Sequence, residues 1–429
     1  MNNGNSYPPV ISVMLLFACL WVQPVGAQGV TPPLPTIVSS NPSPEVERLV
    51  IRSQTLNSTK ELHVLLPEKY HQRTQSYPVM VVLDGEFLFY TVAGIVRHWS
   101  AVTWMPEMIV VGVSYTRRPP LSAQSEAASP SSGLSSRAAF LRDELIPFLD
   151  SRYRTQPFRM IVGLNPSASP ILETMWKTPG LFQANIAIVA GHSLRGRGRR
   201  AMGLALEETF SGALAKSFAD DPDRRSYLYI SSPENHIEPF PTLPQDFQDL
   251  EREMMPHTAR NFTLRTEFVA GGAYATAQAS ILSAFDMIFP RDQWAPQYSD
   301  LTEEEGAALP NIEAYFDNLS LAYGFTITPL EERFRNINSL VGTASQLVRQ
   351  ERFEEATAVS RHAIELYPNT VGGHYQLAKA LEGEGRLQEA EEAAEQALAK
   401  AREFDNYDLV GEAEALLEQI RDELAATTR

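Results

Sequence analysis

The segment YPVMVVLDGE, residues 77–86, decides the fold of this protein. Its middle part, residues 79–83, is a continuous apolar run that stops at Asp84 and Gly85. A short strand that is apolar on both faces is buried on both faces, which is typical of the parallel sheets of α/β proteins. The segment therefore predicts a central strand that is followed directly by a turn at the edge of a sheet.

The same pattern recurs along the chain and indicates a mainly parallel sheet. Further short apolar runs, each predicted to be a strand, lie at residues 108–113, 160–163, 186–190, 227–230 and 264–269. Helices are predicted over 136–153 and 170–178, and residues 46–52 and 60–66 indicate a hairpin. Strands separated by helices predict a doubly wound α/β fold, in which a ligand lies beyond the carboxyl ends of the strands.

The bulk composition limits the classes of partner. The chain has 429 residues, enough for two domains, and its 44% hydrophobic and 21% charged residues are ordinary for a globular protein. A formal net charge of −16 disfavours binding to nucleic acid or to anionic lipid, since both need a basic surface. The sequence shows no metal-ligand spacing and no glycine-rich phosphate loop, so we expect neither a metal nor a cofactor.

The N-terminus has the form of a targeting segment. Residues 10–22 are an apolar run too short to span a bilayer, and Gly26 and Ala27 complete a small-residue cleavage site. We expect a signal peptide over residues 1–27, a periplasmic or extracellular location, and no stable membrane span after cleavage; the alternative is an uncleaved anchor. Residues 28–45 are rich in proline, serine and threonine and predict a flexible lead-in.

The C-terminal part contains an internal repeat of small residues. Five positions recur 34 residues apart: Ala344, Leu347, Phe353, Ala356 and Ala363 correspond to Ala378, Leu381, Leu387, Ala390 and Ala397. The period resembles that of tetratricopeptide repeats, pairs of helices that small residues allow to approach closely, and the alternative is a plain helical hairpin. Two repeats are few, so we expect a helix near 312–323, or the first domain, to pack onto them.

These features divide the chain into domains. We expect an α/β domain at 46–292, a helical connector at 293–335, and repeats with a capping helix at 336–429. The repeats would present a groove to a protein or peptide partner.

Residues 46–290 resemble the bacterial esterases of the enterochelin-esterase (esterase D-like) type, a branch of the α/β-hydrolases. The resemblance rests on YPVMVVLDGE (77–86), MPEMIVVGVSYTRR (105–118), FLRDELIPFLDSRYRT (140–155), RMIVG (159–163) and PGLFQANIAIVA (179–190). Several members of this group also carry tetratricopeptide repeats after the hydrolase domain. The resemblance implies a catalytic serine, acid and histidine in that chain order, with the serine on a sharp turn between a strand and a helix.

The catalytic positions that the resemblance implies are changed. The family's Gly-His-Ser-x-Gly-Gly turn corresponds to GLNPSA at 163–168, which places Asn165 at the nucleophile, and an amide cannot be activated as an alkoxide. The histidine position falls on Ala273 or Tyr274, while Glu234 remains in the loop that carries the acid. The stretch RRPPL at 117–121 replaces the family's Asp-Leu-Thr-Pro run. Departures at three sites predict that Ser-His-acid hydrolysis is lost.

Two other serines are alternative nucleophiles. The motif GHSLRG, residues 191–196, contains Ser193 beside His192, with His236 on the acid loop, but it lacks the second glycine of the hydrolase turn. Ser167 lies in the changed turn itself, without an accompanying histidine.

The candidate ligand-binding residues lie on two loops. The resemblance implies that the loop of Asp84, Gly85 and Glu86 helps to form the oxyanion hole of the hydrolase. If the nucleophile is missing, the alternative is that this loop is only a turn. His192, Ser193 and Arg195 would line the pocket in the second loop, where Arg195 belongs to an arginine cluster. That cluster is either a solvated helix start or an anion site at the mouth of the pocket, where arginines would bind a carboxylate or a phosphate. We expect a small anionic or ester ligand in the hydrolase pocket.

Three hypotheses of function follow. The first is an exported, non-catalytic esterase homologue that binds a ligand or a protein, with the repeats contacting a partner. The second is an active carboxylic-ester hydrolase that uses Ser193 or Ser167. The third is a scaffold protein that works mainly through its repeats.

Overall fold

The computed structural model describes residues 46–115, 133–205, 207–258, 261–294, 297–332 and 338–427. The expected signal peptide, the lead-in and the stretch at 117–121 lie outside the described residues, so these expectations stay predictions. Within the described part of the chain, no helix combines the length and the apolar character that crossing a membrane requires.

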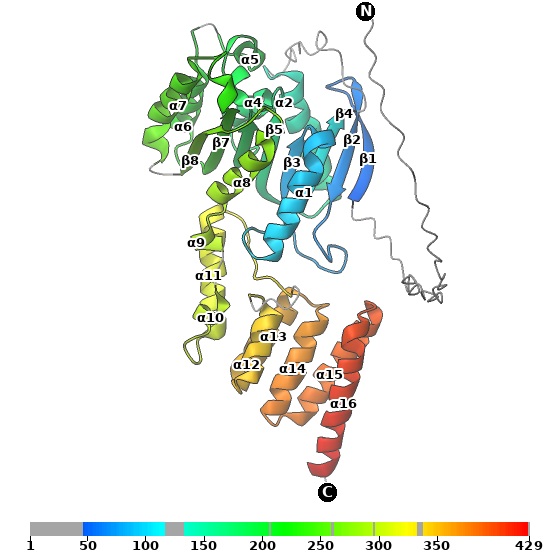
Figure 1. Cartoon of the computed structure of the whole chain (residues 1–429). Helices are drawn as coiled ribbons and strands as arrows, with labels where there is room; N and C mark the ends of the chain where they lie inside the picture. The colour runs from blue at the N-terminus through cyan, green and yellow to red at the C-terminus, as the bar shows by residue number, and fades with distance from the viewer. Residues whose placement is uncertain are drawn as a thin grey trace, which may run out of the picture. The chain divides into compact units, whose positions relative to one another are not determined.

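An eight-stranded sheet forms the centre of the first domain (Figure 1). In spatial order the strands are β1 (Val46–Ser53), β2 (Ser58–Leu65), β4 (Ile109–Tyr115), β3 (Tyr77–Leu83), β5 (Thr155–Leu164), β6 (Ala184–Ile188), β7 (Ser226–Pro233) and β8 (Phe262–Val269). The pairs β1–β2 and β2–β4 are antiparallel, and all other pairs are parallel. The predicted mainly parallel sheet is confirmed, with the predicted hairpin at its antiparallel end.

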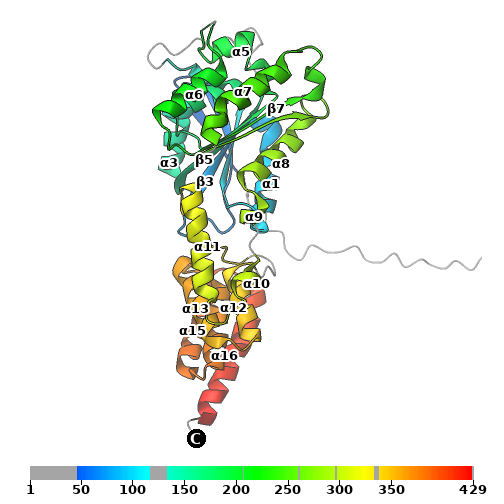
Figure 2. The ribbon, with the colours of Figure 1, turned by 90° about the vertical axis from the view of Figure 1, so that its left-hand side faces the viewer.

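Alternate residues of each strand point to opposite faces, and each face has its own helices. Met80 and Val82 of β3 belong to the core that includes α1 (Gly85–Ala101) and α8 (Thr276–Ile288). Val79 and Val81 belong to the core of the opposite face. The helices of that opposite face are α2 (Ser136–Phe140), α3 (Ile146–Arg152), α4 (Ala168–Lys177), α6 (Phe210–Asp220) and α7 (Leu243–Thr258), and the short helix α5 (Gly196–Ala201) contacts α4. Figure 2 shows α1 and α8 on one side of the sheet and α3 and α6 on the other.

Several elements differ in detail from those expected from the sequence, and three of the differences have a clear structural reason. β6 ends at Ile188, because Val189 takes a left-handed conformation with φ 56°. The helix predicted over 136–153 contains a π-helical turn at Leu141–Leu145, shortly before Pro147, which has no backbone N–H to donate. β7 continues through Ser231 and Ser232 to Pro233, since these residues pair with β8.

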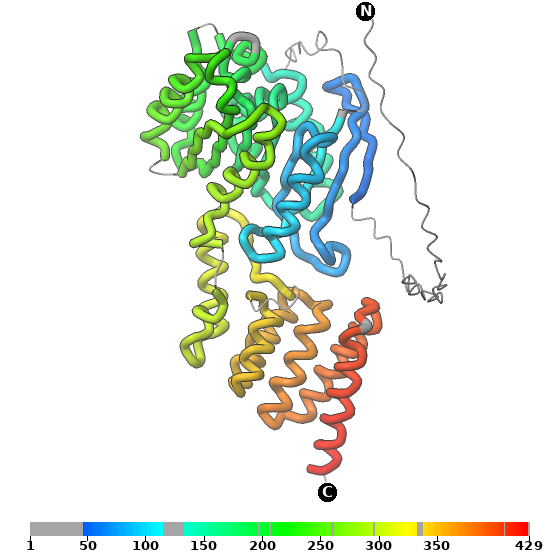
Figure 3. The backbone as a smooth tube through the Cα atoms, in the orientation of Figure 1, coloured from blue at the N-terminus to red at the C-terminus, as the bar shows by residue number. Residues whose placement is uncertain are grey.

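The C-terminal part is entirely helical where the structure describes it. Its helices are α9 (Arg291–Trp294), α10 (Tyr298–Leu301), α11 (Ala308–Tyr323), α12 (Leu340–Arg349), α13 (Phe353–Leu366), α14 (Val371–Gly383), α15 (Leu387–Glu403) and α16 (Tyr407–Thr427). From α12 to α16 each helix packs against the next (Figure 3). The alanines of the 34-residue period are fully buried. The predicted helix pairs are thus present, and their assignment as tetratricopeptide repeats stays a prediction.

The helical pairs share a core with α11 and with the α/β domain. Arg352, at the start of α13, donates a hydrogen bond to the carbonyl oxygen of Thr302 (2.7 Å). Apolar side chains of α1, α8, α11 and α12 belong to one continuous cluster of buried residues. α11 and the α/β domain therefore both pack onto the helix pairs.

A buried ion pair also joins the two regions. Arg73, from the β2–β3 connection, donates to Glu331 (Nε–Oε2 2.9 Å) and to Glu107 (Nη1–Oε2 2.7 Å). Burial by itself would raise the pKa of Glu331, but Lys69 and Arg73 hold this pKa below its ordinary value. Glu331 is therefore kept ionised beside Arg73.

Candidate functional site

The turn between β5 and α4 is the place where the resemblance puts the nucleophile. Asn165 follows the last residue of β5, and its backbone N–H donates to the carbonyl oxygen of Ile188 (3.0 Å). No positive φ occurs in this turn, whereas a catalytic serine needs a sharp, strained elbow. A Cβ on Gly163 would lie 3.0 Å from the Cβ of Ser167, so the remaining glycine lets α4 approach the strand. The turn therefore keeps α4 packed closely against β5, and Asn165 stands at the position that the resemblance assigns to the nucleophile.

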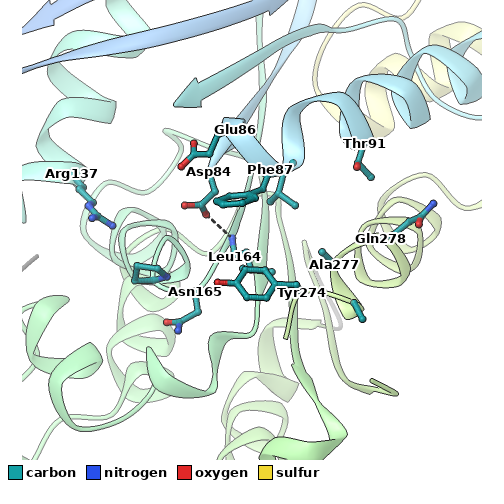
Figure 4. Close-up of a pocket in the computed structure, with 13 residues that line it drawn as sticks. Asp84, Glu86, Phe87, Thr91, Arg137, Leu164, Asn165, Tyr274, Ala277 and Gln278 are labelled. Carbon is teal, nitrogen blue, oxygen red and sulfur yellow. Dashed lines mark hydrogen bonds between the residues drawn. The ribbon is translucent and has the colours of Figure 1, made fainter. Parts of the chain in front are cut away.

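A pocket of about 380 Å³ opens beside this turn (Figure 4). It lies beyond the carboxyl ends of β3, β5 and β8, as expected for a parallel sheet. Its lining includes Asp84, Glu86, Phe87 and Thr91 before and within α1, Leu164 and Asn165 after β5, Arg137 of α2, and Tyr274, Ala277 and Gln278 near the start of α8.

Asn165 and Tyr274, two of the positions that the resemblance assigns to catalytic residues, both line this pocket. Tyr274 is 66% exposed, and its ring lies 6.2 Å from that of Phe87, centroid to centroid. Ala273, the other position considered for the histidine, does not line the pocket; its carbonyl oxygen accepts a hydrogen bond from Thr276 (3.1 Å). None of the described residues that line the pocket is a histidine. A ligand here would meet the amide of Asn165 and the phenol of Tyr274.

Asp84 connects the loop after β3 to the turn after β5. It takes a left-handed conformation, φ 56° and ψ 42°, immediately before α1. Its carboxylate accepts hydrogen bonds from the hydroxyl of Ser167 (2.8 Å) and from the backbone N–H of Leu164 (3.2 Å). Burial raises the pKa of Asp84 to about 6, although both hydrogen bonds act in the opposite direction. These contacts join two walls of the pocket.

Gly85 and Glu86 have different roles: Gly85 allows close packing of α1 against β4, and Glu86 lines the pocket. A Cβ on Gly85 would lie 2.8 Å from Ser114 Oγ and 2.9 Å from the backbone nitrogen of Val113, so only glycine lets α1 begin against β4. Glu86 lines the pocket and stands in the first turn of α1. The loop selected from the sequence thus contributes two acidic side chains to the pocket.

We expect replacement of Asp84 by asparagine to remove a pH dependence of stability. Burial raises the pKa of Asp84 in the folded state to about 6, above its ordinary value of 3.8, so the protonated carboxyl stabilises the fold. This stabilisation is complete below about pH 3.8 and is lost as the pH rises through about 6. Between pH 4 and pH 7, the free energy of unfolding of the wild type should fall by up to about 3 kcal/mol relative to that of Asp84→Asn. Urea unfolding of both proteins at several pH values measures this, and a pH-independent difference would contradict the assignment.

Ser167 is buried rather than presented to the pocket. It is 1% exposed and its hydroxyl is engaged with Asp84. It lines a separate small space of about 30 Å³, not the 380 Å³ pocket. The group beside the Ser167 hydroxyl is thus the carboxylate of Asp84 rather than a histidine. The two residues are 83 positions apart, so their contact could not be predicted from the sequence.

The motif GHSLRG lies away from this pocket. Ser193 is 1% exposed, and its oxygen accepts a hydrogen bond from the hydroxyl of Ser169 (2.9 Å). The side chain of Arg195 forms an ion pair with Asp246. His192 and His236 lie 5.5 Å apart, centroid to centroid. The sequence placed His192, Ser193 and Arg195 at a ligand site, but none of them lines the 380 Å³ pocket.

The acid loop is also separate from the pocket. Glu234 begins a short 3-10 helix, Glu234–His236, after β7 and is exposed. Burial and the neighbouring His192 lower the pKa of His236. Among the described residues, no three His, Cys, Asp or Glu side chains are grouped as a metal site.

Sequence reasoning missed several lining residues, namely Phe87, Thr91, Arg137 and Gln278. Phe87 directly follows Asp84, Gly85 and Glu86, and this adjacency is the one feature of the sequence that could have identified it as a lining residue. An aromatic residue in an amphipathic helix predicts a core contact, whereas Phe87 is 57% exposed.

The strand order, the helices on both faces and a pocket at the carboxyl ends of the strands define an α/β-hydrolase fold followed by a helical region. Residues 53–225 match the family described as "Putative esterase", so this segment carries a domain of that family. The resemblance stated from the sequence is thereby confirmed for this domain.

Solved structures support the same fold. An uncharacterised protein from Capnocytophaga ochracea is 19% identical, with a TM-score of 0.51 and coverage of 82% of this chain and 93% of its own. An IroE-like serine hydrolase from Shewanella oneidensis is 17% identical, with a TM-score of 0.54 and coverage of 76% of this chain and 99% of its own. At these identities the likeness concerns the fold alone. No match to a curated protein is found.

Proposed function

We propose that this chain is a ligand-binding member of the esterase family that does not carry out Ser-His-acid hydrolysis. The supporting observation is that Asn165 and Tyr274 line one pocket. The resemblance assigns Asn165 to the position of the nucleophile, and Tyr274 or its neighbour Ala273 to that of the histidine. An amide and a phenol can hydrogen-bond a ligand, but they supply neither an alkoxide nor a base with a pKa near 7. The pocket therefore retains the means to bind and lacks the means to cleave.

We include two features of the sequence in the proposal. The signal peptide at residues 1–27 would direct export, and the helix pairs would offer a surface to a protein or peptide partner. If the repeats alone carry the function, the protein is a scaffold, and changes in the pocket would then leave partner binding unaffected.

An active ester hydrolase is the second candidate, and one observation favours Ser167 as its nucleophile. The Ser167 hydroxyl donates to Asp84 at 2.8 Å, and the pKa of this carboxyl is about 6, so Asp84 could accept a proton near neutral pH. The burial of Ser167 opposes this candidate, because an ester carbonyl must reach the nucleophilic oxygen.

We expect the purified protein to show no esterase activity towards short-chain p-nitrophenyl esters and no labelling by a fluorophosphonate probe. The matched controls are Ser167→Ala and Ser193→Ala, which remove each alternative nucleophile. Rates and labelling indistinguishable among the three proteins support the proposal. Labelling that disappears only in Ser167→Ala or only in Ser193→Ala would establish the hydrolase and identify its nucleophile.

A further inference from the structure

Two exposed aromatic rings stand at the mouth of the candidate pocket. Phe87 is 57% exposed and Tyr274 is 66% exposed, and their rings are 6.2 Å apart with an interplanar angle of 43°. Figure 4 shows the two rings beside each other, with the Tyr274 hydroxyl towards Asn165. Large aromatic side chains are usually buried, so two of them exposed in one pocket point to a ligand that covers them.

The charges of the same pocket favour a cationic ligand. Asp84 and Glu86 both line it, and Arg137 is the single basic residue among the described lining residues. Figure 4 shows Glu86 and Asp84 near Phe87, while Arg137 stands on the opposite side of Asp84. An anionic ligand at the two rings would be repelled by the nearer carboxylates. The electron-rich ring faces and the carboxylates both attract positive charge.

The volume of the pocket and its uncharged polar side chains indicate an organic cation rather than a bare metal ion. The pocket volume of about 380 Å³ suits a small organic molecule. The described residues contain no cluster of metal-ligating side chains. An alkylated ammonium group is weakly hydrated and needs no hydrogen-bond acceptors, so aromatic faces can hold it, and the amides of Asn165 and Gln278 can bind a polar tail.

We propose that this pocket binds a small organic cation whose alkylated ammonium group lies against both the Phe87 and the Tyr274 ring, with Glu86 as its counter-charge. This inference names the ligand class of the function proposed above and rests on it. The anionic or ester ligand expected from the sequence depended on Arg195, which instead pairs with Asp246 outside this pocket.

Calorimetric titration of the full chain with choline tests the proposal, with the neutral isostere 3,3-dimethylbutan-1-ol as the comparison, in an inorganic buffer. We expect choline to bind at least about tenfold more tightly than the isostere. Equal affinity for the two compounds, or no detectable binding of choline at millimolar concentration, would overturn the proposal. Neither result bears on hydrolysis, which the ester and fluorophosphonate assays decide independently.

Substitutions of pocket residues test where the ammonium group binds. Phe87→Leu and Tyr274→Leu should each weaken choline binding by about fivefold, and Glu86→Gln should weaken binding of choline but not of the isostere. The matched control is Tyr90→Leu, because Tyr90 is an aromatic residue of α1 with 64% exposure that does not line the pocket. If Tyr90→Leu weakens choline binding as much as Phe87→Leu, or if neither pocket variant weakens it, the proposed position is wrong.

Discussion

Replacing Glu331 by glutamine is expected to lower the free energy of unfolding by about 3 kcal/mol. Glu331 is buried and accepts a hydrogen bond from Arg73, which is buried as well. The glutamine keeps the shape of the side chain but leaves the guanidinium of Arg73 with one carboxylate, Glu107, instead of two. A buried charge that loses its counter-charge is costly, because water cannot replace the missing partner.

The control for this experiment is an ion pair of similar length at the surface. Glu414 accepts from Arg402 at 2.6 Å, and both side chains are about half exposed or more. We expect Glu414→Gln to cost less than about 1 kcal/mol, since water screens the pair. Chemical denaturation of the full chain measures both variants. Equal losses would mean that the Arg73–Glu331 pair does not support the junction between the α/β domain and the helices.

Replacing Gly85 by alanine is expected to destabilise the fold by about 1–3 kcal/mol through overpacking. The new Cβ would lie 2.8 Å from Ser114 Oγ and 2.9 Å from the backbone nitrogen of Val113, and backbone cannot move aside cheaply. The start of α1 would have to shift. Because α1 begins beside Asp84 and carries Glu86 and Phe87, we also expect weaker ligand binding in the pocket.

The same helix offers the matched control. Gly94 lies within α1, and a Cβ placed there would have no neighbour within 4 Å. Gly94→Ala should raise the free energy of unfolding by about 0.5–1 kcal/mol, because alanine loses less backbone entropy on forming a helix. Urea unfolding followed by circular dichroism compares the two variants. If Gly85→Ala is as stable as Gly94→Ala, the close approach of α1 to β4 is not a constraint.

The α/β fold and the helix pairs could be read from the sequence because their signals are local. A continuous apolar run such as residues 79–83 specifies a strand buried on both faces, and runs separated by helices leave few arrangements other than a parallel sheet. The alanines at a 34-residue period specify helices that approach closely, and those alanines are fully buried. The apolar run at residues 160–163 likewise predicted a strand, and β5 ends at Leu164, directly before Asn165.

The tertiary structure alone decided which side chains share the pocket. Asp84 and Ser167 are 83 residues apart, and Phe87 and Tyr274 are farther apart still, yet each pair is in contact. Conversely, the conspicuous motif GHSLRG has its serine buried against Ser169 and its arginine paired with Asp246. Periodicity reports which face of an element is buried, because that depends on neighbours along the chain. Contacts between loops depend on how whole elements pack, so the partners of Asp84 and Ser193 could not be predicted from the sequence and were determined by the fold.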